Sequence, residues 1–203
     1  MEKIEILEPG NFYHIYNKGN NNENLFIEEE NYFYFLRLFS KHIKPIANTY
    51  AYCLLKNHFH FLIEIKAEKN LPEKILSKKE LKLSQPFSNF FNAYTKSINK
   101  RYKRIGSLFK ERYKRIKIND ENYLKELVTY IHLNPVKHRF TKDFEQYPHS
   151  SYSSILSDKT THLKRKEVIE WFGDRGNFIY CHQEKFKRLV SDSTDPDLDL
   201  TGL

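Results

Sequence analysis

Two β-rich runs lie close together in the first third of the chain, IANTYAYCLL at 46–55 and FHFLIEI at 59–65. They are joined through the polar pair Lys56-Asn57, and runs joined so closely predict an antiparallel hairpin. The turn of that hairpin is expected near Asn57.

Periodic segments flank this hairpin on both sides. The spacing of apolar and turn residues predicts two more strands, at 11–18 and 109–118. Helical spacing and end signals predict three helices, at 28–43, 86–102 and 121–133. The Lys- and Glu-rich segment 66–82 is expected to be a mobile or weakly helical connection.

The resulting order is β-α-β-β-α-β-α. It matches the split βαβ plan, which is ferredoxin-like and belongs to the α+β class. In that plan a four-stranded antiparallel sheet is covered by helices on one face, and the other face is left free for a ligand. Beyond Phe140 the periodicity weakens, and helices are predicted only at 165–172 and 183–190, as a C-terminal helical extension.

The charge balance favours a polyanionic partner. Lys and Arg number 34 against 26 Asp and Glu, which gives a net charge of +8 and a pI of about 9.2. No apolar run is long enough to span a membrane, and MEKIEILEPG lacks the apolar stretch of a signal peptide. A soluble, cytoplasmic protein is expected. Cys53 and Cys181 are too few for a disulfide framework or a structural zinc site.

His58 and His60 form the first candidate site. Side chains alternate along a strand, so both imidazoles should project from one face while Phe59 and Phe61 point into the core. Two imidazoles can hold a divalent ion, although most histidines bind nothing, and a further ligand would have to come from elsewhere.

Tyr130 and Asn134 lie four residues apart on the third predicted helix and therefore share a face. The amide oxygen of Asn134 suits a hard ion such as Mg²⁺ or Mn²⁺, and the phenol of Tyr130 can attack phosphorus. Taken alone, Asn134 is better interpreted as the last residue of the helix before Pro135.

The segment 94–117 mixes basic and aromatic residues, with Glu111 as its single acid. Such a mixture suggests a groove for phosphates and unstacked bases, although a charged run is often only a solvated face. Arg104, Lys110, Arg112 and Lys114 are expected to make phosphate contacts. The full set of candidate DNA-binding residues is Lys100, Arg101, Lys103, Arg104, Lys110, Arg112, Lys114 and Arg115.

Several ordered motifs between Phe12 and Ser154 resemble the HUH single-tyrosine transposases, in particular their REP-associated branch. The motifs are YHIYNKG at 13–19, LLKNHFHFLI at 54–63, GSLFKERYK at 106–114, YLKELVTYIHLNPVKH at 123–138 and YPHSSY at 147–152.

The resemblance implies that His58 and His60 bind the catalytic metal, Mg²⁺ or Mn²⁺, that Asn134 completes the metal site and that Tyr130 is the nucleophile. It also implies cleavage of single-stranded or hairpin DNA through a 5′-phosphotyrosine link that leaves a free 3′-OH. Relatives of this kind act as monomers or homodimers.

On this basis the catalytic domain is expected at 1–154, an accessory helical extension at 155–190 and a disordered acidic tail at 191–203. One alternative is a non-catalytic, ferredoxin-like nucleic-acid-binding protein, which would leave the set of His58, His60, Tyr130 and Asn134 without a role. A second is a replication or plasmid-relaxing nuclease of the same superfamily, which the order of histidines first and one tyrosine in the last helix disfavours.

Overall fold

The computed structural model describes residues 5–76 and 82–191. Four strands form one sheet in the order β2-β3-β1-β4, and every neighbouring pair is antiparallel. The strands are β1 (Phe12–Lys18), β2 (Ala47–Leu55), β3 (His58–Ile65) and β4 (Lys114–Ile118). This is the strand order of the split βαβ plan, so the predicted fold class and the hairpin with its turn at Lys56-Asn57 are confirmed.

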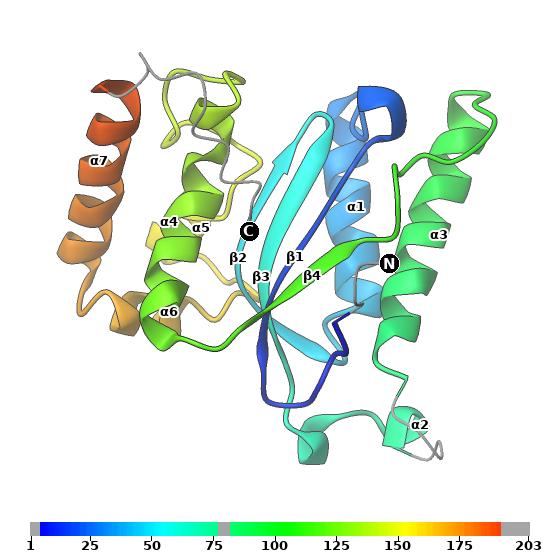
Figure 1. Ribbon diagram of the computed structural model, residues 1–203, viewed down its shortest axis with the longest axis horizontal. Helices are drawn as coiled ribbons and strands as arrows, with labels where there is room; N and C mark the ends of the chain where they lie inside the picture. The colour runs from blue at the N-terminus through cyan, green and yellow to red at the C-terminus, as the bar shows by residue number, and fades with distance from the viewer. Residues whose placement is uncertain (1–4, 77–81, 192–203) are drawn as a thin grey trace.

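The long helices lie on both sides of this sheet. In Figure 1, α1 and α3 lie on one side of the strands, and α4 lies on the other with α7 outside it. The helices are α1 (Glu29–His42), α2 (Glu73–Leu76), α3 (Ser84–Arg101), α4 (Glu121–Lys137), α5 (Tyr152–Leu156), α6 (Arg165–Trp171) and α7 (Arg175–Ser191). Part of the segment expected to be a mobile connection, 77–81, lies outside the described residues, as does the tail from 192 onward.

The first hydrophobic core fills the space between the sheet and helices α1 and α3. Phe59 and Phe61 from β3 pack there against Phe35, Phe39 and neighbouring aromatic rings. Phe59 and Phe61 are therefore on the face opposite His58 and His60, as the alternation predicts. The imidazoles face α4.

The expectation that the second face would be free is wrong. The apolar stripe of α4 packs onto that face, where Leu127 and Ile131 join a second core with Ala51, Cys53 and Leu62. The physical reason is that the middle of β2 carries apolar side chains toward both faces, so each face needs a cover. A cavity lies on this face at the end of β1 and the starts of β3 and β4.

The fourth strand is shorter than predicted. It begins at Lys114, whereas Phe109 forms an isolated bridge with Gly19 and is buried in the first core. Phe109 is apolar because it packs in the first core, and the chain bends at 110–112 before β4 begins. The strand pattern predicted from Phe109 therefore spans two separate segments. The basic residues at 110–112 therefore lie on a loop beside the end of β1.

Helix α4 continues through Pro135, beyond its predicted end at Leu133. It ends in a Schellman motif in which Arg139 has a φ of 59° and Phe140 N–H donates to Pro135 O at 2.8 Å. The proline removes one backbone donor, but His138 N–H still reaches Asn134 O at 2.9 Å, so the helix persists for another turn. Asn134 is thus inside the helix.

The C-terminal extension is part of the second core. Val168 of α6 and Phe178 of α7 are fully buried in that cluster. The helix predicted at 165–172 is confirmed as α6, and the one predicted at 183–190 is the second half of α7. The first half of α7 was not predicted. Its buried residues are Phe178 and His182, and because one of them is polar they do not form an apolar repeat.

A buried polar chain joins α7 to α4 and to the start of α5. His132 Nδ1 lies 2.9 Å from His182 Nε2, His132 Nε2 lies 2.8 Å from Ser151 Oγ, and His182 Nδ1 lies 2.7 Å from Phe178 O. Burial lowers the pKa of His182 to about 4 and holds the pKa of His132 well below its ordinary value. Both imidazoles are neutral at neutral pH.

These pKa shifts predict loss of stability in mild acid. The unfolded chain binds protons at its histidines near pH 6.5 while the folded chain does not, so the stability present above pH 6.5 is lost as pH falls toward 4. Each such histidine costs about 1.4 kcal/mol per pH unit over that interval. Urea midpoints at pH 7.5 and pH 5.0 measure the effect.

We expect a clearly lower urea midpoint at pH 5.0. Replacing both imidazoles in His132→Leu/His182→Leu should make this decrease smaller, because apolar groups do not titrate. The variant His162→Gln, at an exposed position, should keep the wild-type pH dependence. Equal midpoints for the wild type at the two pH values would contradict this account.

Candidate active site

Alternate residues of the two central strands face α4. Tyr16 of β1 lies opposite His60 of β3 in the antiparallel register, and Lys18 lies opposite His58. The His58 and His60 ring centroids are 5.3 Å apart. The two imidazoles therefore share one face, as the sequence predicts.

Helix α4 brings Tyr130 against these strands. Its ring centroid lies 5.7 Å from that of His60 and 6.1 Å from that of His14, edge-on to both. Asn134 is on the same helix one turn later and is fully buried. The structure thus brings the tyrosine of the third predicted helix against the histidines of the hairpin.

Three buried polar atoms at this site have no hydrogen-bond partner among the described residues. They are His58 Nε2, His60 Nε2 and Asn134 Oδ1. The Asn134 amide nitrogen donates to Tyr130 O at 2.8 Å, and His58 Nδ1 lies 2.7 Å from Asn57 Oδ1. These contacts engage the N–H groups of the two side chains. His58 Nε2 and Asn134 Oδ1 are left with lone pairs that no described residue uses.

Unpaired buried polar atoms are costly, so the unpaired Nε2 atoms of His58 and His60, on neighbouring rings, indicate a ligand. Within 5–76 and 82–191, no group of three or more His, Cys, Asp or Glu side chains is placed to hold a metal ion. The donor set is therefore two imidazoles and an amide oxygen, all neutral. Such groups are ordinary ligands for a divalent cation, and the residues present fit one.

Both histidines are held neutral by their surroundings. Burial, with smaller contributions from His138 and Lys18, lowers the pKa of His58 to about 3. Burial likewise holds the pKa of His60 well below its ordinary value, helped by the neighbouring histidines. Both imidazoles therefore stay neutral well below pH 6.5.

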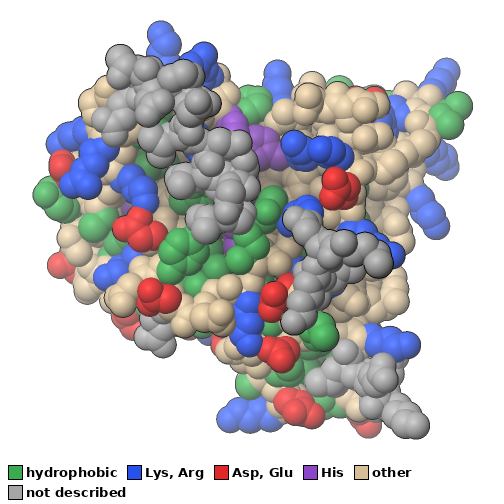
Figure 2. All heavy atoms as spheres, viewed as in Figure 1, with side chains coloured by type: hydrophobic (Ala, Val, Ile, Leu, Met, Phe, Trp, Pro, Cys, Tyr) green, Lys and Arg blue, Asp and Glu red, His purple; other side chains and the backbone are tan. Residues whose placement is uncertain are grey.

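A cavity of about 540 Å³ opens over this site. Its walls include His58, His60, Tyr123 and Tyr130, with Lys110, Arg112 and Lys114 along the β4 side. Figure 2 shows histidine side chains, in purple, reaching the surface in the upper middle of the molecule, with Lys or Arg side chains in blue close by. A phosphate-bearing chain could meet the phenol and the imidazoles here.

Sequence reasoning missed three residues of this site. His14 lies behind His60, His138 has its ring centroid 4.6 Å from that of His58, and Lys137 Nζ lies 5.4 Å from the Tyr130 ring centroid. Strand alternation around Tyr16 could have indicated His14. The position of Lys137, two residues beyond Pro135 in the same helix, could not be inferred while the helix was expected to end before the proline.

The basic segment does not form one surface. Lys110, Arg112 and Lys114 line the cavity, whereas Lys100 and Lys103 are exposed and do not. Arg115 pairs in register with Ile15, so its side chain lies on the opposite face, where it hydrogen-bonds the Tyr113 hydroxyl at 2.8 Å.

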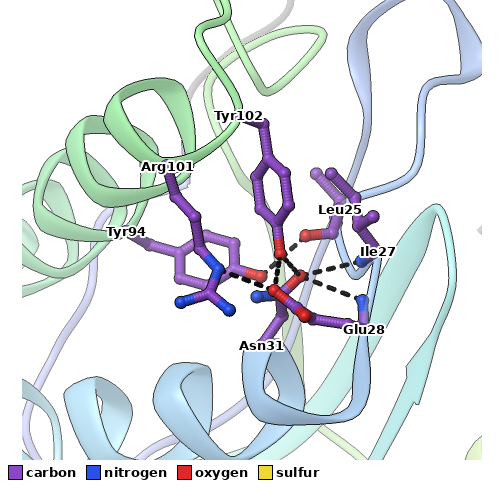
Figure 3. Close-up of polar contacts among 7 residues, drawn as sticks. All are labelled: Leu25, Ile27, Glu28, Asn31, Tyr94, Arg101 and Tyr102. Atoms are coloured by element: carbon purple, nitrogen blue, oxygen red, sulfur yellow. Dashed lines mark hydrogen bonds and ion pairs between the residues drawn. The ribbon is translucent and has the colours of Figure 1, made fainter.

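Two further arginines of this segment are engaged with carboxylates. In Figure 3, Arg101 and Tyr102 at the end of α3 point toward Glu28 and Asn31 at the start of α1. The hydrogen bonds from Arg101 and Tyr102 hold the pKa of Glu28 below its ordinary value. Arg104 is similarly paired with Glu23, and also donates to Asn99 Oδ1 at 2.7 Å.

The aromatic residues of this segment are core residues, contrary to the expectation of a stacking surface for bases. Tyr94 is fully buried and its hydroxyl donates to Leu25 O, as Figure 3 shows, and Phe109 is buried as well. Tyr113 stacks on Phe87 of α3. Tyr94 lies on the buried face of α3, and Phe109 and Tyr113 follow that helix and pack against its aromatic rings.

Among solved structures, one with this architecture is that of a REP-associated tyrosine transposase bound to a REP hairpin. The identity is 17%, the match covers 78% of this chain and 86% of that chain, and the TM-score is 0.61. The two proteins share a fold. No protein-family profile and no curated protein sequence matches the chain. In the described part of the chain, no helix is long and apolar enough to cross a membrane.

Proposed function

We propose that this chain is a metal-dependent, single-tyrosine transposase that cleaves and rejoins single-stranded DNA bearing hairpins. Tyr130 is the nucleophile, and His58, His60 and Asn134 are the metal ligands. The observation that carries the proposal is the edge-on contact of the Tyr130 ring with His60, which, like His58 and Asn134, keeps a buried polar atom without a hydrogen-bond partner among the described residues. The shared fold with a hairpin-bound transposase supports the same substrate class.

The chemistry is a transfer of the phosphoryl group to the phenol. Tyr130 loses its proton, its oxygen forms a bond to phosphorus, and the bond from phosphorus to the 3′ oxygen breaks. The leaving 3′ oxygen takes up a proton, which gives a 3′-OH and a 5′-phosphotyrosine. Attack by another 3′-OH reverses the steps and releases Tyr130, so no nucleotide cofactor is consumed.

The residues around Tyr130 suit these steps. Lys137 places positive charge over the phenol ring, where charge grows as the proton is lost. Lys110, Arg112 and Lys114 can hold the backbone of the strand along the cavity. Bound Mg²⁺ or Mn²⁺ would polarise the scissile phosphate and offset charge in the transition state.

Trapping of the covalent intermediate tests the proposal directly. Wild-type protein is incubated with single-stranded oligonucleotides that carry a hairpin, and adducts are separated by denaturing electrophoresis. We expect an adduct that forms with Mn²⁺ and is absent with a chelator. A chain that binds these oligonucleotides but forms no adduct with any hairpin or divalent ion would instead be the non-catalytic nucleic-acid-binding protein.

The three basic residues of the cavity give a second prediction. Replacing Lys110, Arg112 and Lys114 by Ala should lower the slope of log affinity against log salt by about 0.7 per lost phosphate contact on a single strand. The three together should remove about 2 units of slope. Affinity measured by fluorescence anisotropy at several salt concentrations gives this slope.

A matched control comes from the paired arginines. Arg101→Ala/Arg104→Ala also removes positive charge from the segment, but these guanidinium groups are engaged with Glu28 and Glu23. We expect that variant to keep most of the wild-type slope. If the control loses as much slope as the cavity variant, the DNA path runs over the end of α3 instead.

A further inference from the structure

His14 of β1 is a buried histidine with no role in the proposed ligand set. It is 6% exposed, and its Nε2 atom lies 2.9 Å from Nδ1 of His60. The two rings lie edge to edge and close to one plane, with centroids 5.1 Å apart and an angle of 23° between their planes. The contact is therefore a hydrogen bond between two imidazoles, and one proton lies between them.

The position of that proton decides what His60 offers to the cavity. If His14 donated it, neutral His60 would carry its own proton on Nε2, a buried atom that finds no partner among the described residues. A buried N–H without an acceptor is among the rarest and most costly arrangements in proteins. If His60 Nδ1 donates to His14 instead, His60 Nε2 presents a lone pair.

We propose that His14 is a positioning residue that holds His60 in the Nδ1–H tautomer and aims the Nε2 lone pair at the metal. The inference rests on the proposed function for its metal. Histidine ligands commonly donate their second ring N–H to a neighbouring acceptor, which fixes the tautomer and the ring orientation. Asn57 makes the equivalent contact to His58, at 2.7 Å from its Nδ1.

The rings around His14 and His60 restrict any other orientation. Tyr16 stacks on His60 with centroids 5.7 Å apart and lies 4.8 Å from the His14 ring centroid. Tyr130 is edge-on to both imidazoles, at interplanar angles of 84° and 81°. A flip of the His60 ring would have to displace these neighbours, so the hydrogen bond and the packing select the same state.

The first test observes the tautomer in the metal-free protein at neutral pH. Long-range ¹⁵N–¹H correlation spectra of the imidazoles should show His60 protonated on Nδ1. His14→Gln should preserve this signature, because the glutamine side-chain oxygen can take the place of Nε2 as acceptor. His14→Phe keeps a ring of similar shape but has no acceptor, and His60 should lose the Nδ1–H signature.

The second test measures Mn²⁺ affinity by electron paramagnetic resonance. We expect His14→Phe to weaken binding by roughly 10- to 100-fold, the range for loss of such an orienting contact, and His14→Gln to lose much less. His162→Gln removes an exposed imidazole away from this cavity and should bind Mn²⁺ as the wild type does. Circular dichroism reports whether each variant is folded.

The outcomes separate the two ideas. A wild-type protein without saturable Mn²⁺ binding would overturn the proposed metal site, while the spectra of the metal-free protein still test His14. Wild-type spectra and affinity in His14→Phe would overturn the inference. If His14→Phe does not fold, His14→Gln is compared with His14→Asn, because the asparagine side chain is too short to reach His60. Equal Mn²⁺ affinities for these two variants would also overturn the inference.

Discussion

Tyr130→Phe is expected to form no covalent adduct and to leave single-stranded DNA uncut, while binding it as the wild type does. The substitution removes only the phenol oxygen from a ring that packs edge-on against His14 and His60, so the fold should be kept. Loss of a nucleophile or its activating partner lowers turnover by on the order of 10⁴- to 10⁶-fold in other enzymes. Denaturing electrophoresis of labelled hairpin oligonucleotides measures both products.

Tyr123→Phe is the matched control. Tyr123 lines the same cavity from the same helix, and burial together with the nearby Glu126 raises the pKa of its phenol. Its proton is therefore harder to remove than that of a free phenol, and we expect the Tyr123→Phe variant to cleave at close to the wild-type rate. Adduct formation lost in Tyr123→Phe and retained in Tyr130→Phe would move the nucleophile to Tyr123.

His58→Ala/His60→Ala should abolish cleavage while DNA affinity stays within about tenfold of the wild type, because phosphate contacts supply most of the binding energy. The double variant removes two of the three buried polar atoms at the site that lack a partner among the described residues. Cleavage assays with Mg²⁺, with Mn²⁺ and with a chelator measure the first effect, and anisotropy titrations measure the second.

Because His60 is buried, this variant will lose some stability, and its thermal transition should be recorded beside its activity. The control His42→Ala/His162→Ala removes two imidazoles that lie outside the cavity walls and should cleave normally. If the His58 and His60 variant cleaves in the presence of a chelator, the metal assignment is wrong, and the two imidazoles have another role.

Local sequence patterns predicted much of the fold. Strand alternation around His58 and His60 predicted which side chains face the core, and the register of β1 with β3 confirms it. The turn at Lys56-Asn57 was predicted from the polar pair between two β-rich runs. Helix α1 was predicted from the spacing of its apolar residues. Such signals are local, because backbone geometry links side-chain direction to sequence spacing.

The predictions that failed depended on distant parts of the chain. Helix α4 was expected to stop before Pro135, yet it continues because its apolar stripe is buried against β2 and a Schellman motif closes it later. The mixture of basic and aromatic residues at 94–117 suggested a groove for unstacked bases, but Tyr94 and Phe109 both lie in the first core. The neighbouring residues in the sequence do not distinguish an aromatic ring that is buried against a sheet from an exposed ring that stacks on a nucleotide base.

By itself the sequence determined the order of strands and helices, the shared face of His58 and His60, and the shared helix of Tyr130 and Asn134, because these follow from backbone periodicity. Only the tertiary structure decided that α4 covers the second face of the sheet and that His14 stands behind His60. It also divided the basic segment between the cavity, two ion pairs and the opposite face. Those outcomes depend on contacts between residues far apart in the chain, such as the 46 positions that separate His14 from His60, and no local pattern encodes which partner a buried polar atom will meet.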